Sequence, residues 1–311
     1  MLRLAEYVSS EEIKDLCQTS DAWGWYRVSI NYALISLAFS LFIITPNLLT
    51  LLLGSWLMGG RILGVAVLAH DASHGSLFRS AKLNKIVGRW LLGGFVFVDF
   101  DEFKASHLAH HQLAGTVQDP DRLFVQGYPA TPNSMLRKLL RDVTGVNGVK
   151  ELLYQIKTSN WQKRLRNLVI HSVALSLLIA FQAPWAYAIF WLAYLFTYPL
   201  LSRMRIMGEH GNVSDSLKLD PRLNTRTTYA NFLEKLMLAP NQVNYHLEHH
   251  IHQNIPAHNL AKAHRLFKDR GMYLDFDCIE QNYWAVLKRN ISKSHGKSNL
   301  KRHAASSISE V

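Results

Sequence analysis

Charged residues are missing from two long segments of the chain. No Asp, Glu, Lys or Arg occurs in residues 28–60 or in residues 167–202. Each segment is too long for one membrane helix, which needs roughly 20 residues, and each contains a proline in a turn-like setting, Pro46 and Pro184. The pattern therefore predicts two helical hairpins, with membrane spans at about 29–45, 47–69, 167–183 and 184–202.

Buried core helices are the alternative explanation of these segments, and the placement of the basic residues argues against it. All but one of the 34 Lys and Arg residues lie in residues 1–27, 79–166 and 203–302, and the two short hairpin tips carry none. Positive charge gathers on the cytoplasmic side of membrane proteins. We therefore expect a multi-pass membrane protein whose termini and long middle loop face the cytoplasm.

Further details refine this picture of an all-α integral membrane protein with a cytoplasmic helical cap. Residues 90–98 are apolar but too few to span, so we expect a re-entrant or interfacial segment there. Arg61 is the one basic residue inside an apolar run, where it has either a functional role or a pairing role within the bundle. We expect one domain over residues 1–290 and a mobile polar tail over residues 291–311.

Averages over the whole chain conceal this organisation. The 311 residues carry a net charge of +11 and a mean hydropathy of −0.01, as in a basic soluble protein. We interpret the charge mainly as an orientation signal and not as a sign of nucleic-acid binding, with docking of acidic electron carriers or phosphate headgroups as a smaller cause. Cys17 and Cys278 are single and distant, which excludes a disulfide framework and fits a reducing compartment.

Histidine is the residue type that points to chemistry. Eight of the 15 histidines fall in three clusters: His70 and His74; His107, His110 and His111; His246, His249 and His250. Residues spaced i, i+3 and i+4 share one face of a helix, so each cluster can direct its imidazoles to one point. Imidazole is the commonest neutral metal ligand, and eight ligands exceed what one tetrahedral zinc uses. The clusters therefore predict two metal ions, of iron, zinc or copper, on the cytoplasmic side of the membrane.

Carboxylates beside the clusters are candidates for orienting the imidazoles through their second ring nitrogen. Asp71 and Glu248 lie inside their clusters, and Asp119 and Asp121 follow the second one. Each could instead be a solvated surface carboxylate, and this alternative is stronger for Asp119 and Asp121, which lie outside the clusters.

The remaining histidines show no repeated spacing. We expect His171, which lies within an apolar helix, to be hydrogen-bonded inside the bundle. Three others are expected at the surface or next to the ligands: His252, His258 and His264. His295 and His303 belong to the tail and are expected to have no specific role.

The order HDxxH, HxxHH, HxxHH around two membrane hairpins resembles the integral-membrane fatty acid desaturase and hydroxylase superfamily. The likeness covers roughly residues 30–270 and is carried by these segments: His70-Asp71-Ala72-Ser73-His74-Gly75, Gln118-Asp119-Pro120-Asp121, and Asn244-Tyr245-His246-Leu247-Glu248-His249-His250 followed by Ile255-Pro256. The resemblance implies two non-haem irons held by these boxes. It also implies that O2, with electrons from a partner protein, is used to place double bonds or hydroxyl groups in hydrocarbon chains.

The resemblance implies roles for further residues. Relatives have another iron-binding histidine before the third box, and Glu209-His210-Gly211 matches it, which makes nine ligands: His70, His74, His107, His110, His111, His210, His246, His249 and His250. Acyl-CoA desaturases have an Asn four residues before this extra histidine. This chain has Ile206 there, so Glu209 or a solvent molecule would replace it. Arg226, in a segment that resembles bacterial relatives, would pair with Glu209.

The resemblance favours a desaturase acting on a long acyl chain. Hydroxylation or ketolation of a lipid such as a carotenoid by the same centre is the near alternative, and a membrane metal transporter is a more distant one. No GxGxxG follows a strand and no His-Pro-Gly-Gly motif is present, so neither a nicotinamide or flavin site nor a fused cytochrome b5 domain is expected. Electrons would then come from a separate donor of ferredoxin or cytochrome b5 type. A short chain without fused domains favours a bacterial inner membrane over the endoplasmic reticulum.

Overall fold

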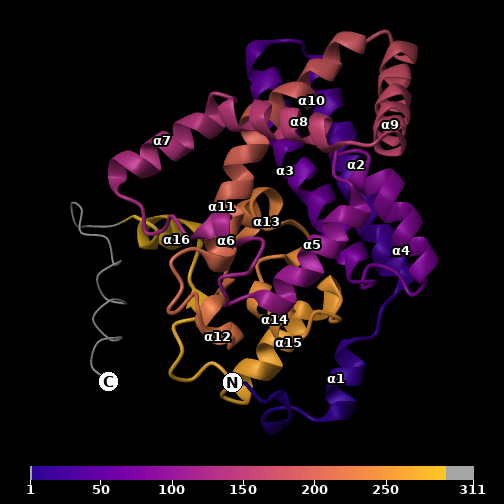
Figure 1. Cartoon of the computed structure of the whole chain (residues 1–311). Helices are drawn as coiled ribbons and strands as arrows, with labels where there is room; N and C mark the ends of the chain where they lie inside the picture. Colours follow the sequence, from indigo (N-terminus) through magenta and orange to yellow (C-terminus); the bar gives the residue numbers. More distant parts are fainter. Residues whose placement is uncertain (1, 292–311) are drawn as a thin grey trace.

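Long apolar helices make up the upper half of the molecule in Figure 1, and a cap of shorter helices lies below them. The computed structural model describes residues 2–291. The predicted polar tail, with His295 and His303, therefore lies almost wholly outside the described residues. Helix α2 (Asp21–Ile44) and helix α3 (Leu48–Ser73) pack against each other as the predicted first pair. Asn47 begins α3 directly after the proline turn, because its side chain accepts a hydrogen bond from the backbone N–H of Thr50.

The last apolar helix is longer than the sequence pattern predicts. It runs over Pro184–His210 through four consecutive parts: η3 (Pro184–Tyr187), α10 (Ala188–Leu192), the π-helical turn η4 (Ala193–Thr197) and α11 (Tyr198–His210). It therefore continues past the expected end at residue 202 and carries Arg203, Arg205 and His210 into the cap.

Three helices within residues 2–291 are long and apolar enough to cross a membrane: Asp21–Ile44, Leu48–Ser73 and Pro184–His210. They contain three of the four predicted spans. The other predicted span, at 167–183, corresponds to α9 (Trp161–Ala180), whose first turns carry Lys163, Arg164 and Arg166. Since these charges shorten its apolar part, a bundle of four spans in two hairpins stays a prediction.

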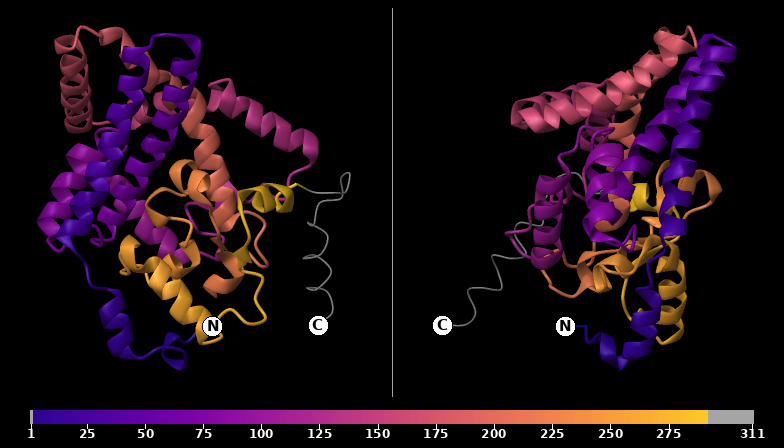
Figure 2. Two further views of the ribbon diagram at one scale, coloured as in Figure 1. Left: turned by 180° about the vertical axis from the view of Figure 1, so that it is seen from behind. Right: turned by 90° about the vertical axis from the view of Figure 1, so that its right-hand side faces the viewer.

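The cap is built from short elements around the ends of α3 and α11. Its central helices are α5 (Phe100–Leu113), α14 (His246–Ile251) and α15 (Ala257–Asp269). Two short strands, β1 (Thr227–Thr228) and β2 (Ile279–Glu280), pair in parallel, so the chain is mainly but not wholly helical. Figure 2 shows the N-terminal α1 (Ser10–Leu16) at the end of the cap farthest from the apolar helices, where it contacts α15.

The remaining helices connect these parts. They are η1 (Leu4–Glu6), α4 (Ala81–Val87), the π-helix η2 (Gly88–Gly93), α6 (Arg122–Val125), α7 (Pro132–Val143), α8 (Val146–Thr158), α12 (Pro221–Asn224), α13 (Phe232–Met237), η5 (Pro240–Gln242) and α16 (Tyr283–Arg289). The apolar segment 90–98 begins in η2. Leu92, Phe95 and Val96 are buried in the same core as α3, which is the packing that a re-entrant segment requires.

Arg61 is buried in the middle of α3. Its guanidinium donates hydrogen bonds to Asn31 Oδ1 of α2, at 3.2 Å, and to the backbone carbonyl of Leu236. A charge at this depth is stabilised when its donors find such acceptors. Of the two roles expected for Arg61, the structure shows pairing within the bundle.

Candidate metal centre

The three histidine clusters and His210 meet where the apolar helices enter the cap. His70 lies in the last turn of α3 and His74 caps that helix. The second cluster lies on α5, His210 ends α11, and the third cluster lies on α14. The i, i+3 and i+4 spacing puts each cluster on one face of its helix. The structure thus brings all nine predicted ligands together, from four elements.

Five of these histidines form a first group. The ligand atoms of His70, His74, His107, His111 and His249 all lie within 4.8 Å of one another. The Nε2 atom of His111 lies 2.9 Å from that of His249 and 3.1 Å from that of His107. The group joins α3, α5 and α14 around a single point.

The other four form a second group. Ligand atoms of His110, His210 and His250 lie within 4.8 Å of one another, and the Nε2 atoms of His110 and His250 are 3.3 Å apart. His246 belongs here because its Nε2 atom is 3.0 Å from that of His210. His110 and His111 are neighbours in the chain but belong to different groups, and so do His249 and His250. The two groups therefore lie side by side.

The donor atoms fit metal ions. Ligand nitrogens about 2.1 Å from one ion stand roughly 3 Å from each other, which is the spacing of these Nε2 pairs. Nε2 of His70 and both ring nitrogens of His74 are buried and have no hydrogen-bond partner within residues 2–291. Burial lowers the pKa of His74 to about 4 and that of His111 to about 2, so both imidazoles are neutral at pH 7 and offer free lone pairs.

Hydrogen-bond acceptors orient several of these rings from outside. Nδ1 of His70 lies 3.0 Å from an Asp71 oxygen, and Nδ1 of His110 lies 2.8 Å from an Asp119 oxygen. A carboxylate accepts the Nδ1 proton and so leaves Nε2 free to bind a metal. These contacts match the orienting role expected for both carboxylates. Asp121, also a candidate, is more distant, at 3.9 Å from Nδ1 of His110, and is more exposed.

One orienting group was not predicted. Nδ1 of His210 lies 3.0 Å from the backbone carbonyl oxygen of Asn224. A backbone acceptor cannot be predicted from residue type or spacing, because every residue has the same backbone carbonyl whatever its side chain.

Glu248 does not orient a ligand histidine, contrary to the sequence-based expectation. Its carboxylate is fully buried and accepts hydrogen bonds from Tyr273, at 2.5 Å, and from Thr227, and it contacts His264 Nδ1 at 2.6 Å. On α14 the side chain points away from the face that carries His246, His249 and His250. It therefore links the ligand helix to α15 and β1.

The predicted pair of Arg226 and Glu209 is wrong. Arg226 is fully buried and donates to the backbone carbonyls of Gly211 and Asn212. Glu209 instead accepts a hydrogen bond of 2.6 Å from Arg205, which the sequence reasoning missed. The i, i+4 spacing of the two residues on α11 was the available signal.

Glu209 remains near the second group, with Oε1 at 3.6 Å from Nδ1 of His246. Ile206, one residue after Arg205, offers no ligand atom.

The other described histidines have separate partners. His171 forms a hydrogen bond with the Tyr187 hydroxyl and stacks on Phe97, as expected for a bundle histidine. His264 is buried against Glu248 and Tyr229, so it is not a surface residue. The last two lie outside both groups: His252 is near Cys17, and His258 stacks on Trp23.

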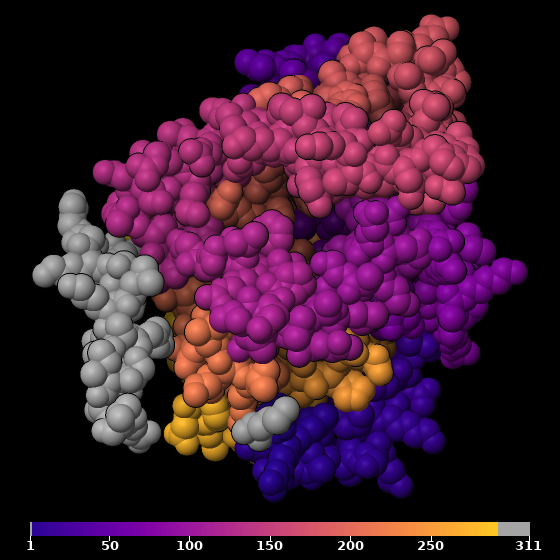
Figure 3. All heavy atoms as spheres, viewed as in Figure 1, coloured from indigo at the N-terminus to yellow at the C-terminus, as the bar shows by residue number. Residues whose placement is uncertain are grey.

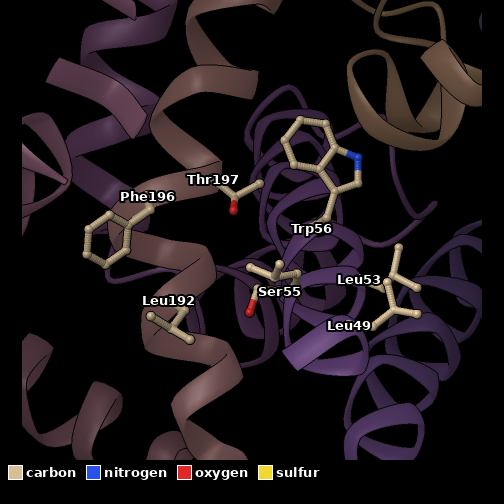
Figure 4. Close-up of a pocket in the computed structure, with 8 residues that line it drawn as sticks. Leu49, Leu53, Ser55, Trp56, Leu192, Phe196 and Thr197 are labelled. Carbon is tan, nitrogen blue, oxygen red and sulfur yellow. The ribbon is translucent and has the colours of Figure 1, made fainter. Parts of the chain in front are cut away.

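An apolar groove lies far from the histidines, between the start of α3 and the π-helical turn η4. Figure 4 shows it lined by Leu49, Leu53, Trp56, Leu192 and Phe196. Each residue advances a helix by about 1.5 Å, so Leu49 is roughly 30 Å along α3 from His70. The groove is therefore not part of the metal centre, and its exposed leucines fit contact with lipid.

Comparison with known proteins agrees with the geometry. The sequence profile of the fatty acid desaturase family matches residues 46–276. Dihydrorhizobitoxine desaturase from Bradyrhizobium elkanii is 27% identical over 232 residues, which cover 68% of this chain and 65% of that protein. The sn-1 oleoyl-lipid 12-desaturase from Picosynechococcus sp. is 23% identical over 301 residues, 88% of this chain and 84% of that protein. Beta-carotene ketolase from Paracoccus sp. is 28% identical over 211 residues, 65% of this chain and 74% of that protein.

The matched region includes all nine histidines and two of the three apolar helices, α3 and Pro184–His210. The family is one of membrane-bound oxidoreductase enzymes that act in lipid metabolism through non-haem iron. The similar proteins include desaturases and a ketolase. The chain is thus a membrane-bound oxidoreductase enzyme, and it belongs to the fatty acid desaturase family.

Proposed function

We propose that the protein is a non-haem di-iron, O2-dependent desaturase that introduces a double bond into a long acyl chain. The observation that carries this proposal is the division of nine imidazoles into two adjacent groups, with each His-His pair contributing one ring to each group. Such a division supports two ions side by side. A single structural metal would need about four of these ligands.

The nine histidines would hold the two irons: His70, His74, His107, His111 and His249 the first; His110, His210, His246 and His250 the second. The irons supply the reactivity with O2 that breaks an unactivated C–H bond, which no side chain can do by acid or base chemistry. Asp71 and Asp119 would orient their imidazoles. Burial of five of the nine rings limits the access of water: His70, His107, His110, His246 and His249. Glu209, held by Arg205, would stand next to the second iron in place of the Asn of some relatives.

The position of the centre supports a lipid substrate and a separate electron donor. His70 and His74 end α3, and His210 ends α11, while the other six histidines lie on cap helices. An acyl chain can therefore approach from the bilayer while a water-soluble donor approaches from the cap. We propose a donor of ferredoxin or cytochrome b5 type; an acyl-lipid desaturase from Helianthus annuus that resembles part of this chain is named as ferredoxin-dependent. The basic residues favour cytoplasmic termini. We propose a bacterial inner membrane as the location.

Hydroxylation or ketolation is the second candidate, and the similarity to a beta-carotene ketolase favours it specifically. The metal-transporter hypothesis has no such support. It predicts polar residues along an ion path within the spanning helices, whereas the nine histidines lie at one end of the apolar helices.

Metal analysis tests the di-iron centre. Full-length protein loaded with iron in the absence of zinc, which competes for nitrogen ligands, should hold about two irons per chain. The variants His110→Ala and His249→Ala should each lose iron and activity, while His258→Ala, outside both groups, should keep both. Iron-loaded protein with a single iron, or activity that survives either ligand substitution, would refute the di-iron proposal.

Product analysis separates the two reactions. Acyl lipids or a carotenoid are added to iron-loaded protein together with O2 and a ferredoxin reducing system. The masses of the products are then measured by mass spectrometry. Desaturation removes two hydrogen atoms, whereas hydroxylation and ketolation add oxygen. Oxygen gain on a carotenoid without desaturation of any acyl lipid would favour the second candidate.

A further inference from the structure

Arg205 of α11 is a cation beside the second histidine group, and most of its donors are unused. Its Nε donates a hydrogen bond of 2.6 Å to Oε1 of Glu209. The same oxygen lies 3.6 Å from Nδ1 of His246, so one carboxylate separates the guanidinium from a ring of the second group. Among residues 2–291, the two terminal nitrogens of Arg205 have no hydrogen-bond partner. A guanidinium has five N–H donors, so four of them are available to a ligand.

These four donors are neither at the open surface nor sealed in the core. The Arg205 side chain is 18% exposed, so solvent or a ligand can reach it. Pairing with Glu209 compensates the charge of the guanidinium but uses only one N–H. Withdrawing such a group from water without further acceptors is unfavourable, so the position favours a bound acceptor.

A buried hydroxyl lies near the guanidinium. Tyr283 begins α16 and is 2% exposed, and within the described residues its hydroxyl has no hydrogen-bond partner. This hydroxyl lies within electrostatic range of Arg205 and Glu209. The ring packs directly on α11 at Gly208, where a Cβ atom would stand 2.8 Å from a ring carbon. Because an unpaired buried hydroxyl costs free energy, a ligand that accepts from both Tyr283 and Arg205 would be stabilised.

Other carboxylates near this cation face the histidines. Asp71 and Asp119 each lie against the Nδ1 atom of a ligand histidine, and Asp121 is 3.9 Å from Nδ1 of His110. In the part of the chain that the structure describes, none of the three is hydrogen-bonded to Arg205. These residues therefore do not supply the acceptor for its terminal nitrogens.

The molecular surface is open towards α11 at this level. Helix α8 packs about half-way along the apolar helices, since a Cβ atom at Gly148 would stand 2.2 Å from the Leu195 carbonyl oxygen. Arg205 follows about 15 Å further along the same helix, towards the histidines. Figure 3 shows a hollow between α7 and α8 on one side and the segment from α5 to α6 on the other, with atoms of α11 at its floor. A ligand can therefore approach α11 between α8 and the cap.

We propose that Arg205 and Tyr283 bind an anionic group of the substrate, a carboxylate or a phosphate. The planar guanidinium matches two oxygens of such a group, and the tyrosine hydroxyl donates to one of them. Two metal ions held by neutral imidazoles leave positive charge nearby, which favours an anion further. The proposal rests on the desaturase function and narrows its substrate. Since only Glu209 separates Arg205 from the second group, the anion lies close to the bond that is oxidised.

Ligand binding tests this site without turnover. Full-length, iron-loaded protein in phosphatidylcholine nanodiscs is kept free of O2 and of any electron donor. Binding of radiolabelled dodecanoate, dodecyl phosphate and dodecanol is measured, with empty nanodiscs subtracted. At least one of the two anions should bind at least about tenfold more tightly than the alcohol, because hydrogen bonds to charged groups are strong. The tighter anion identifies the source as a free acid or a phospholipid, whereas equal binding of all three ligands would overturn the proposal.

Two substitutions assign the binding to these side chains. Arg205→Gln should weaken anion binding at least about tenfold and Tyr283→Phe about three- to tenfold, while binding of dodecanol should not change. The matched controls are Arg265→Gln, exposed on α15, and Tyr194→Phe, about 16 Å before Arg205 on its helix, and both should bind as the wild type does. Iron is counted in every variant. If Arg205→Gln loses iron, Tyr283→Phe carries the test; undiminished anion binding by iron-replete variants would contradict the proposal.

The products test the position of the anion. In hexadecanoate the double bond should lie in the half of the chain nearer the carboxylate, and a double bond in the methyl half would show that the anion is not held beside the centre. Selective anion binding without any desaturation would refute the proposed function and not this site. Desaturation with equal binding of the three ligands would refute the site alone.

Discussion

At the scale of single residues, the centre depends on which nitrogen of each imidazole is free. Asp71 and Asp119 face the Nδ1 atoms of His70 and His110, and the Asn224 carbonyl faces Nδ1 of His210. Acceptors at these positions hold the proton on Nδ1, so Nε2 keeps its lone pair. The Nε2 atoms of His110 and His210, two of the rings oriented in this way, lie 3.3 Å from Nε2 of His250 and 3.0 Å from Nε2 of His246.

Asp119 provides the sharpest test at this scale. Asp119→Asn should lower the metal affinity of the second group roughly 10- to 100-fold, because the amide accepts the His110 Nδ1 proton less strongly than the carboxylate does. The measurement is metal retained during dialysis against increasing chelator. Asp121→Asn is the matched control, since its carboxylate is 3.9 Å from His110 and more exposed, and it should retain metal as the wild type does. Equal losses in the two variants would contradict an orienting role for Asp119.

At the scale of elements, buried polar links join the helices that carry ligand histidines to neighbouring helices. Arg203 of α11 bonds to Asp142 of α7, whose side chain is 1% exposed, and Glu248 joins α14 to α15. Both links end on helices that carry ligand histidines. The helices are therefore positioned by side-chain pairs as well as by apolar packing.

The buried pair predicts a difference between two similar substitutions. Asp142→Ala should destabilise the protein by about 3 kcal/mol, because it leaves the Arg203 guanidinium without its partner. Asp101→Ala removes an equally bidentate pair with Arg89, at 2.7 and 2.8 Å, but at an exposed site, and should cost at most about 1 kcal/mol. Thermal unfolding of both variants in the same detergent compares them. A similar shift of the midpoint for both would show that the α7 link does not stabilise the fold.

At the scale of the whole molecule, the metal centre lies between an apolar end and a polar cap. Leucines at the start of α3 are exposed, among them Leu48 at 70%, which is favourable in lipid and unfavourable in water. About 26 residues later the same helix ends at His70 and His74. One helix thus connects the far side of the bilayer with the ligands.

The predicted topology is tested by cysteine labelling of intact cells. Leu48→Cys and Phe181→Cys, both at exposed positions near hairpin tips, should react with an impermeant reagent from outside. Lys218→Cys, exposed in the cap, should react only after the membrane is opened. If position 181 behaves like position 218, then α9 does not cross the membrane and the second hairpin is wrong.

Much of the fold and of the site was predictable from local pattern. The predictions drew on uncharged segments, proline turns and the spacing of the three clusters, all of which depend on residues close in sequence. The apolar helices, and the histidine faces of α5 and α14, agree with those predictions. The first turns of α9 differ, because Lys163, Arg164 and Arg166 extend that helix into polar surroundings. Glu248 and Arg226 were misassigned because their partners are distant in the chain or are backbone carbonyls.

The sequence by itself determined which histidines can act together on each helix, because helical periodicity alone puts i, i+3 and i+4 on one face. It also determined that the helices before them are apolar. Only the tertiary structure decided how the nine imidazoles divide, since His110 and His111 are neighbours in the chain and yet belong to different groups. That division depends on the approach of α3, α11 and α14 to α5, which is set by the packing of segments far apart in sequence and not by any local spacing.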